Sequence, residues 1–159
     1  MDRRAVSELG TPDLAIAGFQ VWVHGYQYPD VVDVWDANWL RISAHCGASG
    51  ASVWVGGAIL ETAGFLSLAR GAARMHATLS GDAVLDSHEP NIMVRIATAD
   101  RTGHVTVVVE LTPDHLTQQH RFEFAIDQSY LPAVVAQCHR VLERYPVRDA
   151  ASLSSRDSV

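Results

Sequence analysis

Lysine is absent from this sequence of 159 residues, and all twelve of its basic side chains are arginine. Eighteen Asp and Glu residues outnumber them, which gives a formal net charge of −6. Nucleic acid is therefore not expected as a direct ligand, because neutralising a phosphate backbone takes clustered Lys and Arg. The acidic balance instead suits solubility and encounter with a basic protein partner.

Cysteines and long apolar runs are also scarce. The two cysteines, Cys46 and Cys138, lie far apart and belong to no CxxC pair, which argues against a disulfide scaffold and a structural zinc site and predicts buried thiols. The N-terminus lacks the apolar segment of a signal peptide, and no stretch approaches the roughly 18 apolar residues of a membrane span. The sequence thus predicts a cytoplasmic protein without membrane contact.

Motifs for catalysis and cofactor binding are missing too. No GxSxG, Walker A or dinucleotide-binding pattern occurs, and no HExxH or HxH pair is present. The histidines are scattered along the chain at His24, His45, His76, His88, His104, His115, His120 and His139. We therefore expect no catalytic residue, no cofactor and no metal ion.

Apolar and polar residues alternate in six segments, as in strands with one buried face. These segments are Phe19–Val23, Leu40–Cys46, Val53–Val55, Ile92–Ile96, Val105–Leu111 and Phe122–Ile126. Short turns such as Asp100–Gly103 indicate antiparallel pairing. Two further segments, Glu61–Leu79 and Tyr130–Tyr145, carry apolar residues at helical spacing.

The order of these segments predicts an α+β fold with the arrangement βββαβββα. We expect an antiparallel sheet of about six strands with two helices packed on one face. Gly64 and Gly71 in the first helix suggest close packing on the sheet. One domain is expected over residues 13–148, between a flexible N-terminus at 1–12 and a flexible polar tail at 149–159.

Several residues predict where these elements begin and end. Ser129 is expected to cap the second helix through its hydroxyl, and Pro132 suits the first helical turn. Pro146 predicts that this helix ends at Tyr145. The run Glu89, Pro90 and Asn91 predicts a turn leading into a strand, and a structural role for Glu89 is favoured over acid–base chemistry.

An acidic and aromatic stretch lies between the first two predicted strands. Asp30, Asp33 and Asp36 are spaced by three, but the glycine turn of a calcium loop is absent. Ordinary loop carboxylates, or a charged contact surface, are the better interpretations. Trp35 and Trp39 frame Asn38, whose side chain can cap or bridge the backbone locally.

Four segments in order resemble the WapI-like immunity proteins, which are small cytosolic bacterial proteins associated with contact-dependent toxin systems. The resemblance spans Tyr26 to Arg148 and rests on WDANWL (Trp35–Leu40), HEPNIMV (His88–Val94), FEFAIDQSYL (Phe122–Leu131) and RYPVR (Arg144–Arg148). It implies a non-catalytic protein that binds the toxic C-terminal domain of a secreted toxin and blocks it. In the best-known systems of this kind the toxin is a nuclease, and an acidic partner for a basic nuclease makes electrostatic sense.

The shared motifs consist mostly of apolar, turn and cap residues, which predicts that they determine the fold. These structural residues are Trp35, Asn38, Trp39, Glu89, Pro90, Asn91, Asp127, Ser129 and Pro146. Trp35 and Trp39 are expected to anchor the entry to the second strand. Asp30, Asp33 and Asp36 then form the hypothetical contact with the cognate toxin.

Two other functions stay open from the sequence. In the first, the Asp and His side chains converge after folding and serve a metal-binding or hydrolytic enzyme. In the second, the chain is a homo-oligomeric scaffold without activity of its own. A monomer or a homodimer is expected.

Overall fold

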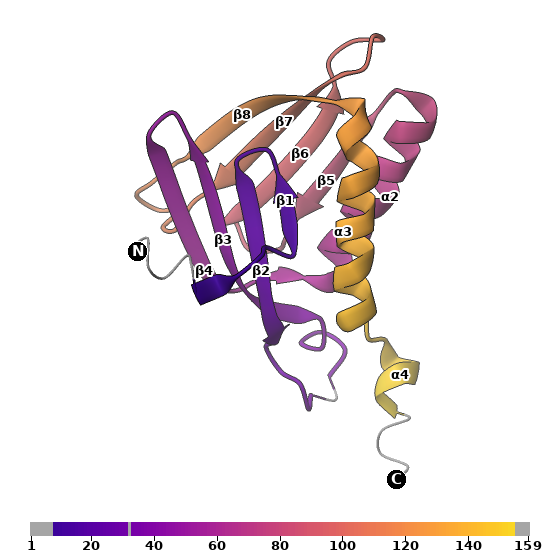
Figure 1. The fold of residues 1–159 in the computed structure, drawn as a ribbon. Helices are drawn as coiled ribbons and strands as arrows, with labels where there is room; N and C mark the ends of the chain where they lie inside the picture. The colour runs from indigo at the N-terminus through magenta and orange to yellow at the C-terminus, as the bar shows by residue number, and fades with distance from the viewer. Residues whose placement is uncertain (1–7, 32, 155–159) are drawn as a thin grey trace.

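Two four-stranded antiparallel sheets make up most of the computed structural model, which describes residues 8–31 and 33–154 (Figure 1). The first sheet has the strand order β1-β2-β3-β4 and the second the order β5-β6-β7-β8. The strands are β1 (Leu14–Ile16), β2 (Phe19–Tyr26), β3 (Trp39–Ala48), β4 (Ala51–Glu61), β5 (Asp82–Asp86), β6 (Ile92–Thr98), β7 (His104–Leu111) and β8 (Arg121–Asp127).

Helix α2 (Thr62–Thr78) connects the first sheet to the second. Helix α3 (Leu131–Arg144) follows β8 through a short 3-10 turn, η1 (Gln128–Tyr130), and α4 (Ala150–Ser154) lies near the C-terminus. Helices α2 and α3 pack side by side at one end of the two sheets (Figure 1). No helix within the described residues is long and apolar enough to span a membrane.

The α+β class is confirmed, but the single sheet of about six strands is wrong. The structure has two sheets in the order ββββαββββα, because β1 and β5 were not predicted. Strand β1 has three residues, too few to show alternation, and β5 follows α2 after only a short turn. Alternation fixes which face of a strand is buried but not which strand is its neighbour, so it could not separate the two sheets.

The turns between strands follow the sequence closely. Residues 99–103 join β6 to β7, as the run Asp100–Gly103 predicted, and Thr98 pairs with Val105. Strands β3 and β4 meet at Ser49 and Gly50, both with positive φ, at 50° and 86°. A two-residue hairpin turn with this backbone matches the twist of its strands and favours glycine.

Close packing explains the glycines of α2, as predicted. A Cβ atom on Gly71 would lie 2.6 Å from the Cβ of Ala83, and one on Gly64 would lie 2.9 Å from the carbonyl oxygen of Asp86. The helix therefore approaches β5 more closely than a larger residue allows. One hydrophobic core includes residues of both sheets, α2 and α3, among them Phe19, Leu40, Phe65, Val107 and Val134.

The prediction that Ser129 caps α3 is wrong. The side chain of Asp127 accepts a hydrogen bond of 2.8 Å from the backbone N–H of Ser129, so Asp127 caps the 3-10 turn η1 instead. Helix α3 begins after this turn without a side-chain cap. Pro132 does lie in its first turn, and the helix ends before Pro146 as expected.

The chain ends lie partly outside the described residues. Part of the tail predicted to be flexible, residues 150–154, forms α4, and Leu153 in that helix is 4% exposed. Residues 1–7 and 155–159 are outside the described part. The flexibility of residues 1–12 and 149–159 and the domain limits at 13–148 stay predictions.

Candidate partner-binding loop

Residues 27–38 form the β2–β3 loop, which joins two neighbouring strands at one end of the first sheet (Figure 1). A backbone hydrogen bond of 2.8 Å from Gln27 N–H to the carbonyl of Trp39 closes the loop where the strands separate. Val32 within the loop is outside the described residues. All three predicted contact residues, Asp30, Asp33 and Asp36, belong to this loop.

A buried arginine fastens the base of the β2–β3 loop. The guanidinium of Arg148 donates hydrogen bonds of 3.0 Å to the carbonyl oxygens of Tyr28 and Pro29 and one of 2.7 Å to that of Ala37. Arg148 is only 4% exposed, and its guanidinium lies 3.8 Å from the centre of the Tyr26 ring. One side chain from the C-terminal segment thus holds carbonyls at both ends of the loop.

Asn38 connects the same base to two other parts of the chain. Its amide nitrogen donates to the carbonyl of Arg148 at 2.9 Å, and its amide oxygen accepts from the backbone N–H of Arg148 at 2.7 Å. The hydroxyl of Thr62, the first residue of α2, donates to the same oxygen at 3.1 Å. The sequence predicted a local bridge for Asn38, whereas these bonds link segments far apart in the chain.

The motif RYPVR therefore packs against the motif WDANWL. Besides the Arg148 contacts, the Tyr26 hydroxyl donates to the carbonyl of Pro146, and the rings of Tyr26 and Tyr145 meet edge to face at 5.5 Å. The buried role of Arg148 was not predicted. The sequence offers one signal for it, since both motifs belong to the ordered set of four on which the resemblance rests.

The tip of the β2–β3 loop is exposed. Trp35 is 82% exposed and Val34 40%, and Tyr28, closer to the base, is 45% exposed. Asp33 shapes the tip, since its side chain accepts from the backbone N–H of Trp35 at 2.9 Å. The prediction that Trp35 anchors the entry to the second strand is wrong, because a side chain this exposed contributes little packing.

Asp30, Asp33 and Asp36 are exposed in the same loop as Trp35. A large exposed aromatic in the same loop as three carboxylates suits a partner that offers an apolar pocket with a basic rim, because buried aromatics anchor interfaces and rim charges steer encounter. Preorganisation adds to this, since a loop already held at its base loses little freedom on binding.

The other predicted structural residues lie away from the loop tip. Trp39 begins β3 and is partly buried, with its ring 6.4 Å from that of His88. The side-chain amide of Asn91 donates to the carbonyl of Thr112 at 2.9 Å, and the backbone N–H of Thr112 donates back to the carbonyl of Asn91. Glu89 and Pro90 are exposed in the turn between β5 and β6.

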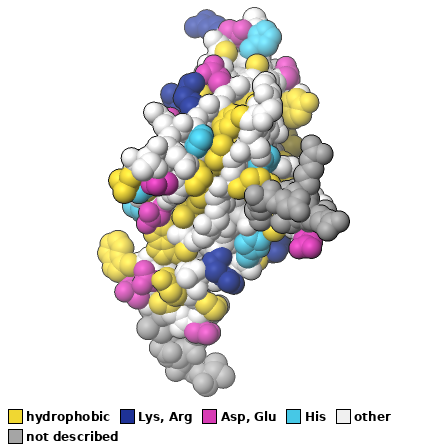
Figure 2. All heavy atoms as spheres, turned by 90° about the vertical axis from the view of Figure 1, so that its left-hand side faces the viewer, with side chains coloured by type: hydrophobic (Ala, Val, Ile, Leu, Met, Phe, Trp, Pro, Cys, Tyr) yellow, Lys and Arg dark blue, Asp and Glu magenta, His cyan; other side chains and the backbone are white. Residues whose placement is uncertain are grey.

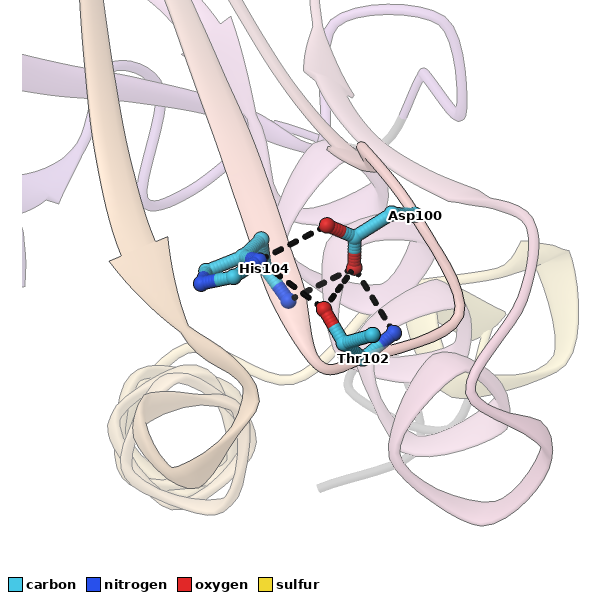
Figure 3. Close-up of polar contacts among 3 residues, drawn as sticks. All are labelled: Asp100, Thr102 and His104. Carbon is cyan, nitrogen blue, oxygen red and sulfur yellow. Dashed lines mark hydrogen bonds and ion pairs between the residues drawn. The ribbon is translucent and has the colours of Figure 1, made fainter.

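A polar cluster occupies the turn between β6 and β7 (Figure 3). One carboxylate oxygen of Asp100 accepts from the backbone N–H and the hydroxyl of Thr102, each at 2.7 Å, and the other lies 2.7 Å from Nδ1 of His104. The hydrogen bonds from Thr102 lower the pKa of Asp100, and the bond to Asp100 raises the pKa of His104. The Thr102 hydroxyl is bonded to the carboxylate, so this cluster fastens a turn and does not activate a nucleophile.

The structure scatters the remaining histidines. His88 lies 2.6 Å from Glu61, and this hydrogen bond raises the pKa of His88. Within residues 8–31 and 33–154, no group of three or more His, Cys, Asp or Glu side chains is placed to hold a metal ion. Cys46 and Cys138 are buried, and burial raises their pKa values to about 11 and about 12.

An exposed aromatic side chain is the kind of residue that anchors protein interfaces when a partner buries it. The model of the immunity protein WapI-like family matches residues 13–146, and the chain belongs to this family. The resemblance seen in the four sequence motifs is thereby confirmed. A search of curated proteins finds no match.

Two solved structures show a partial likeness to this chain. The CdiA-CT/CdiI toxin and immunity complex from Enterobacter cloacae has a TM-score of 0.39 at 9% identity, covering 64% of this chain and 88% of that chain. The crystal structure of WHY1 from Arabidopsis thaliana has a TM-score of 0.47 at 8% identity, covering 89% and 90%. At TM-scores below 0.5, neither likeness bears on the function of this chain.

Proposed function

We propose that this protein binds a cognate bacterial toxin domain and neutralises it without catalysis. Membership in the immunity family supports this role. The exposed Trp35 at the tip of the fastened β2–β3 loop is the observation that supports a contact through this loop. An exposed aromatic side chain on a loop that is fastened at its base gains apolar burial when a partner covers it.

The negative charge of the loop indicates which kind of partner surface it would bind. Asp30, Asp33 and Asp36 favour a basic surface, and a nuclease presents such a surface because it must bind phosphates. When the loop is bound to that surface, its carboxylates compete with nucleic acid for the basic side chains of the toxin. Neutralisation then follows from occlusion of the toxin, and the immunity protein needs no chemistry of its own.

Co-expression with the toxin encoded immediately upstream tests this function. The expected result is rescue of growth, together with a toxin–immunity complex that elutes as one species on gel filtration. Nuclease activity of the toxin, measured on DNA and RNA, should fall in proportion to complex formed. Absence of both rescue and complex would overturn the proposal.

A matched pair of triple variants tests the place of contact. The first, Asp30→Asn with Asp33→Asn and Asp36→Asn, changes the net charge from −6 to −3, since three negative charges are removed. The second, Asp86→Asn with Glu89→Gln and Glu143→Gln, makes the same change at exposed positions elsewhere. We expect the association rate with the toxin to fall about tenfold only in the first variant, since nearby charges steer encounter.

Stopped-flow association at low and high salt measures this difference. The gap between the two variants should shrink at high salt, because screening weakens exposed charges. An equal loss in both variants would mean that overall charge, and not the β2–β3 loop, attracts the toxin.

A further inference from the structure

Each sheet has two edge strands, and three of the four edges are protected. The side-chain amide of Gln137 on α3 pairs with the outer edge of β1, accepting from Ala15 N–H at 2.8 Å and donating to its carbonyl at 3.3 Å. Helix α2 packs against β5 so closely that a Cβ on Gly71 would lie 3.2 Å from the carbonyl of Asp82. Strand β8 has exposed charges at Arg121, Glu123 and Asp127, which discourage strand addition.

Among the described residues, none of these three kinds of protection is found at strand β4. The ten residues from Ala51 to Leu60 include no charge, and Ala51–Ala58 pair with β3 in continuous register. Ala51, Ser52, Gly56 and Gly57 are exposed. Within the described part of the chain, no backbone hydrogen bond is made to the outer edge of Ala51–Ala58.

The side of the molecule on which β4 lies also favours contact. Strand β4 is the outermost strand of its sheet on the left of Figure 1, and Figure 2 looks onto that side. Hydrophobic side chains form a band across this face, and most of the acidic side chains lie toward its ends and margins (Figure 2). A long, uncharged edge of this kind is a template for pairing with another strand.

We propose that β4 pairs antiparallel with β4 of a second copy of this chain, which joins the two first sheets into one of eight strands. A two-fold axis at Val55 places Trp54 opposite Gly56 of the other copy and Val53 opposite Gly57. Ser52 then lies opposite Ala58. In this register Trp54 and Val53 each meet a glycine and Val55 meets Val55 of the other copy, so the strand is complementary to itself.

Charge favours a second copy over a basic partner at this edge. Two chains of net charge −6 repel as wholes, but the uncharged β4 lets them meet without like charges in contact. Pairing of one short strand buries less than the roughly 1,200 Å² of a stable interface, so the dimer is weak and forms with rising concentration. This inference does not rest on the proposed toxin-binding function, because the β2–β3 loop takes no part in it.

Sedimentation of the chain without toxin tests the dimer. The wild type should shift from monomer to dimer as its concentration rises through the micromolar range into the millimolar range. Gly56→Lys should stay monomeric, because it places two lysines beside the two-fold axis, and a Cβ at Gly56 has only an ordinary contact of 3.6 Å. Ala136→Lys on the exposed face of α3 adds the same charge elsewhere and should dimerise like the wild type.

A wild type that stays monomeric throughout, or a Gly56→Lys variant that dimerises as well as Ala136→Lys, overturns the proposal. Thermal unfolding of both variants checks that each is folded. If the wild type is monomeric alone and Gly56→Lys weakens toxin binding, the edge serves a strand of the toxin and the second-copy proposal is wrong.

A disulfide experiment tests the register. Under mild oxidation, a mixture of Ser52→Cys and Ala58→Cys chains should give a covalent dimer, while each variant alone should give little. Cys46 and Cys138 do not interfere, since both are buried. Dimers formed equally well by one variant alone would rule out the two-fold axis at Val55.

Discussion

The base and the tip of the β2–β3 loop are neighbours in sequence but opposite in construction. At the base, Arg148 and Asn38 make hydrogen bonds to three separate parts of the chain. At the tip, Trp35 is 82% exposed. One short motif, WDANWL, thus contains both a residue that holds the fold, Asn38, and a residue whose side chain is left exposed, Trp35.

Loss of Arg148 should have the largest effect on the base. Arg148→Met keeps apolar bulk but removes every donor to the carbonyls of Tyr28, Pro29 and Ala37. We expect the free energy of unfolding to fall by about 3 kcal/mol, because buried polar groups lose their partners. Urea denaturation measures this loss. Arg140→Met on the exposed face of α3 is the control and should change stability little.

Asn38→Ala should cost less, because it removes a smaller group. The variant leaves the backbone N–H and carbonyl of Arg148 without their side-chain partner, and we expect a loss of about 2 kcal/mol in the same measurement. A variant as stable as the wild type would show that the base of the loop is not held in the way described here.

The Asp100–His104 turn offers a third, weaker way to hold a loop. The folded pKa of His104 is raised, so its contribution is fully present below the unfolded value of about 6.5 and is lost as pH rises through the folded pKa. The folded pKa of Asp100 is lowered, so its contribution is present above about 3.8 and is lost as pH falls through the folded pKa.

Stability of the wild type should therefore decline slightly from pH 6 to pH 8. The free energy of unfolding of His104→Ala should decline less across this range. His88→Ala is the control, and it should retain the part of the decline that comes from His104. The effect is the smallest of those described, since both partners are exposed. An identical pH dependence in wild type and His104→Ala would contradict it.

Local patterns in the sequence predicted the local structure well. Alternation identified the longer strands, helical spacing identified α2 and α3, and Gly71 correctly indicated close packing. Strand neighbours were not predictable, because period-two alternation is the same in one sheet or two. Burial of a tryptophan was not predictable either, since Trp35 and Trp39 share a motif but differ in exposure.

The residues of the β2–β3 loop also differ in how far the sequence alone could assign them. Asp30, Asp33 and Asp36 were proposed from charge and spacing, and the structure places them in the loop that presents Trp35. Arg148 could not be assigned from sequence, because an arginine near a C-terminal tail is usually solvated, and only the folded chain brings it beneath the loop.

Paired measurements of stability and toxin affinity for Trp35→Ala test the central claim most directly. We expect the free energy of unfolding to change by less than about 0.5 kcal/mol, as for other exposed positions. Toxin affinity should fall by about 30-fold, as for an interface anchor. Leu116→Ala, at a position that is 83% exposed on the β7–β8 connection, should change neither. An unfolded Trp35→Ala variant, or a stable one with wild-type toxin affinity, would contradict the assignment of the loop tip to the partner.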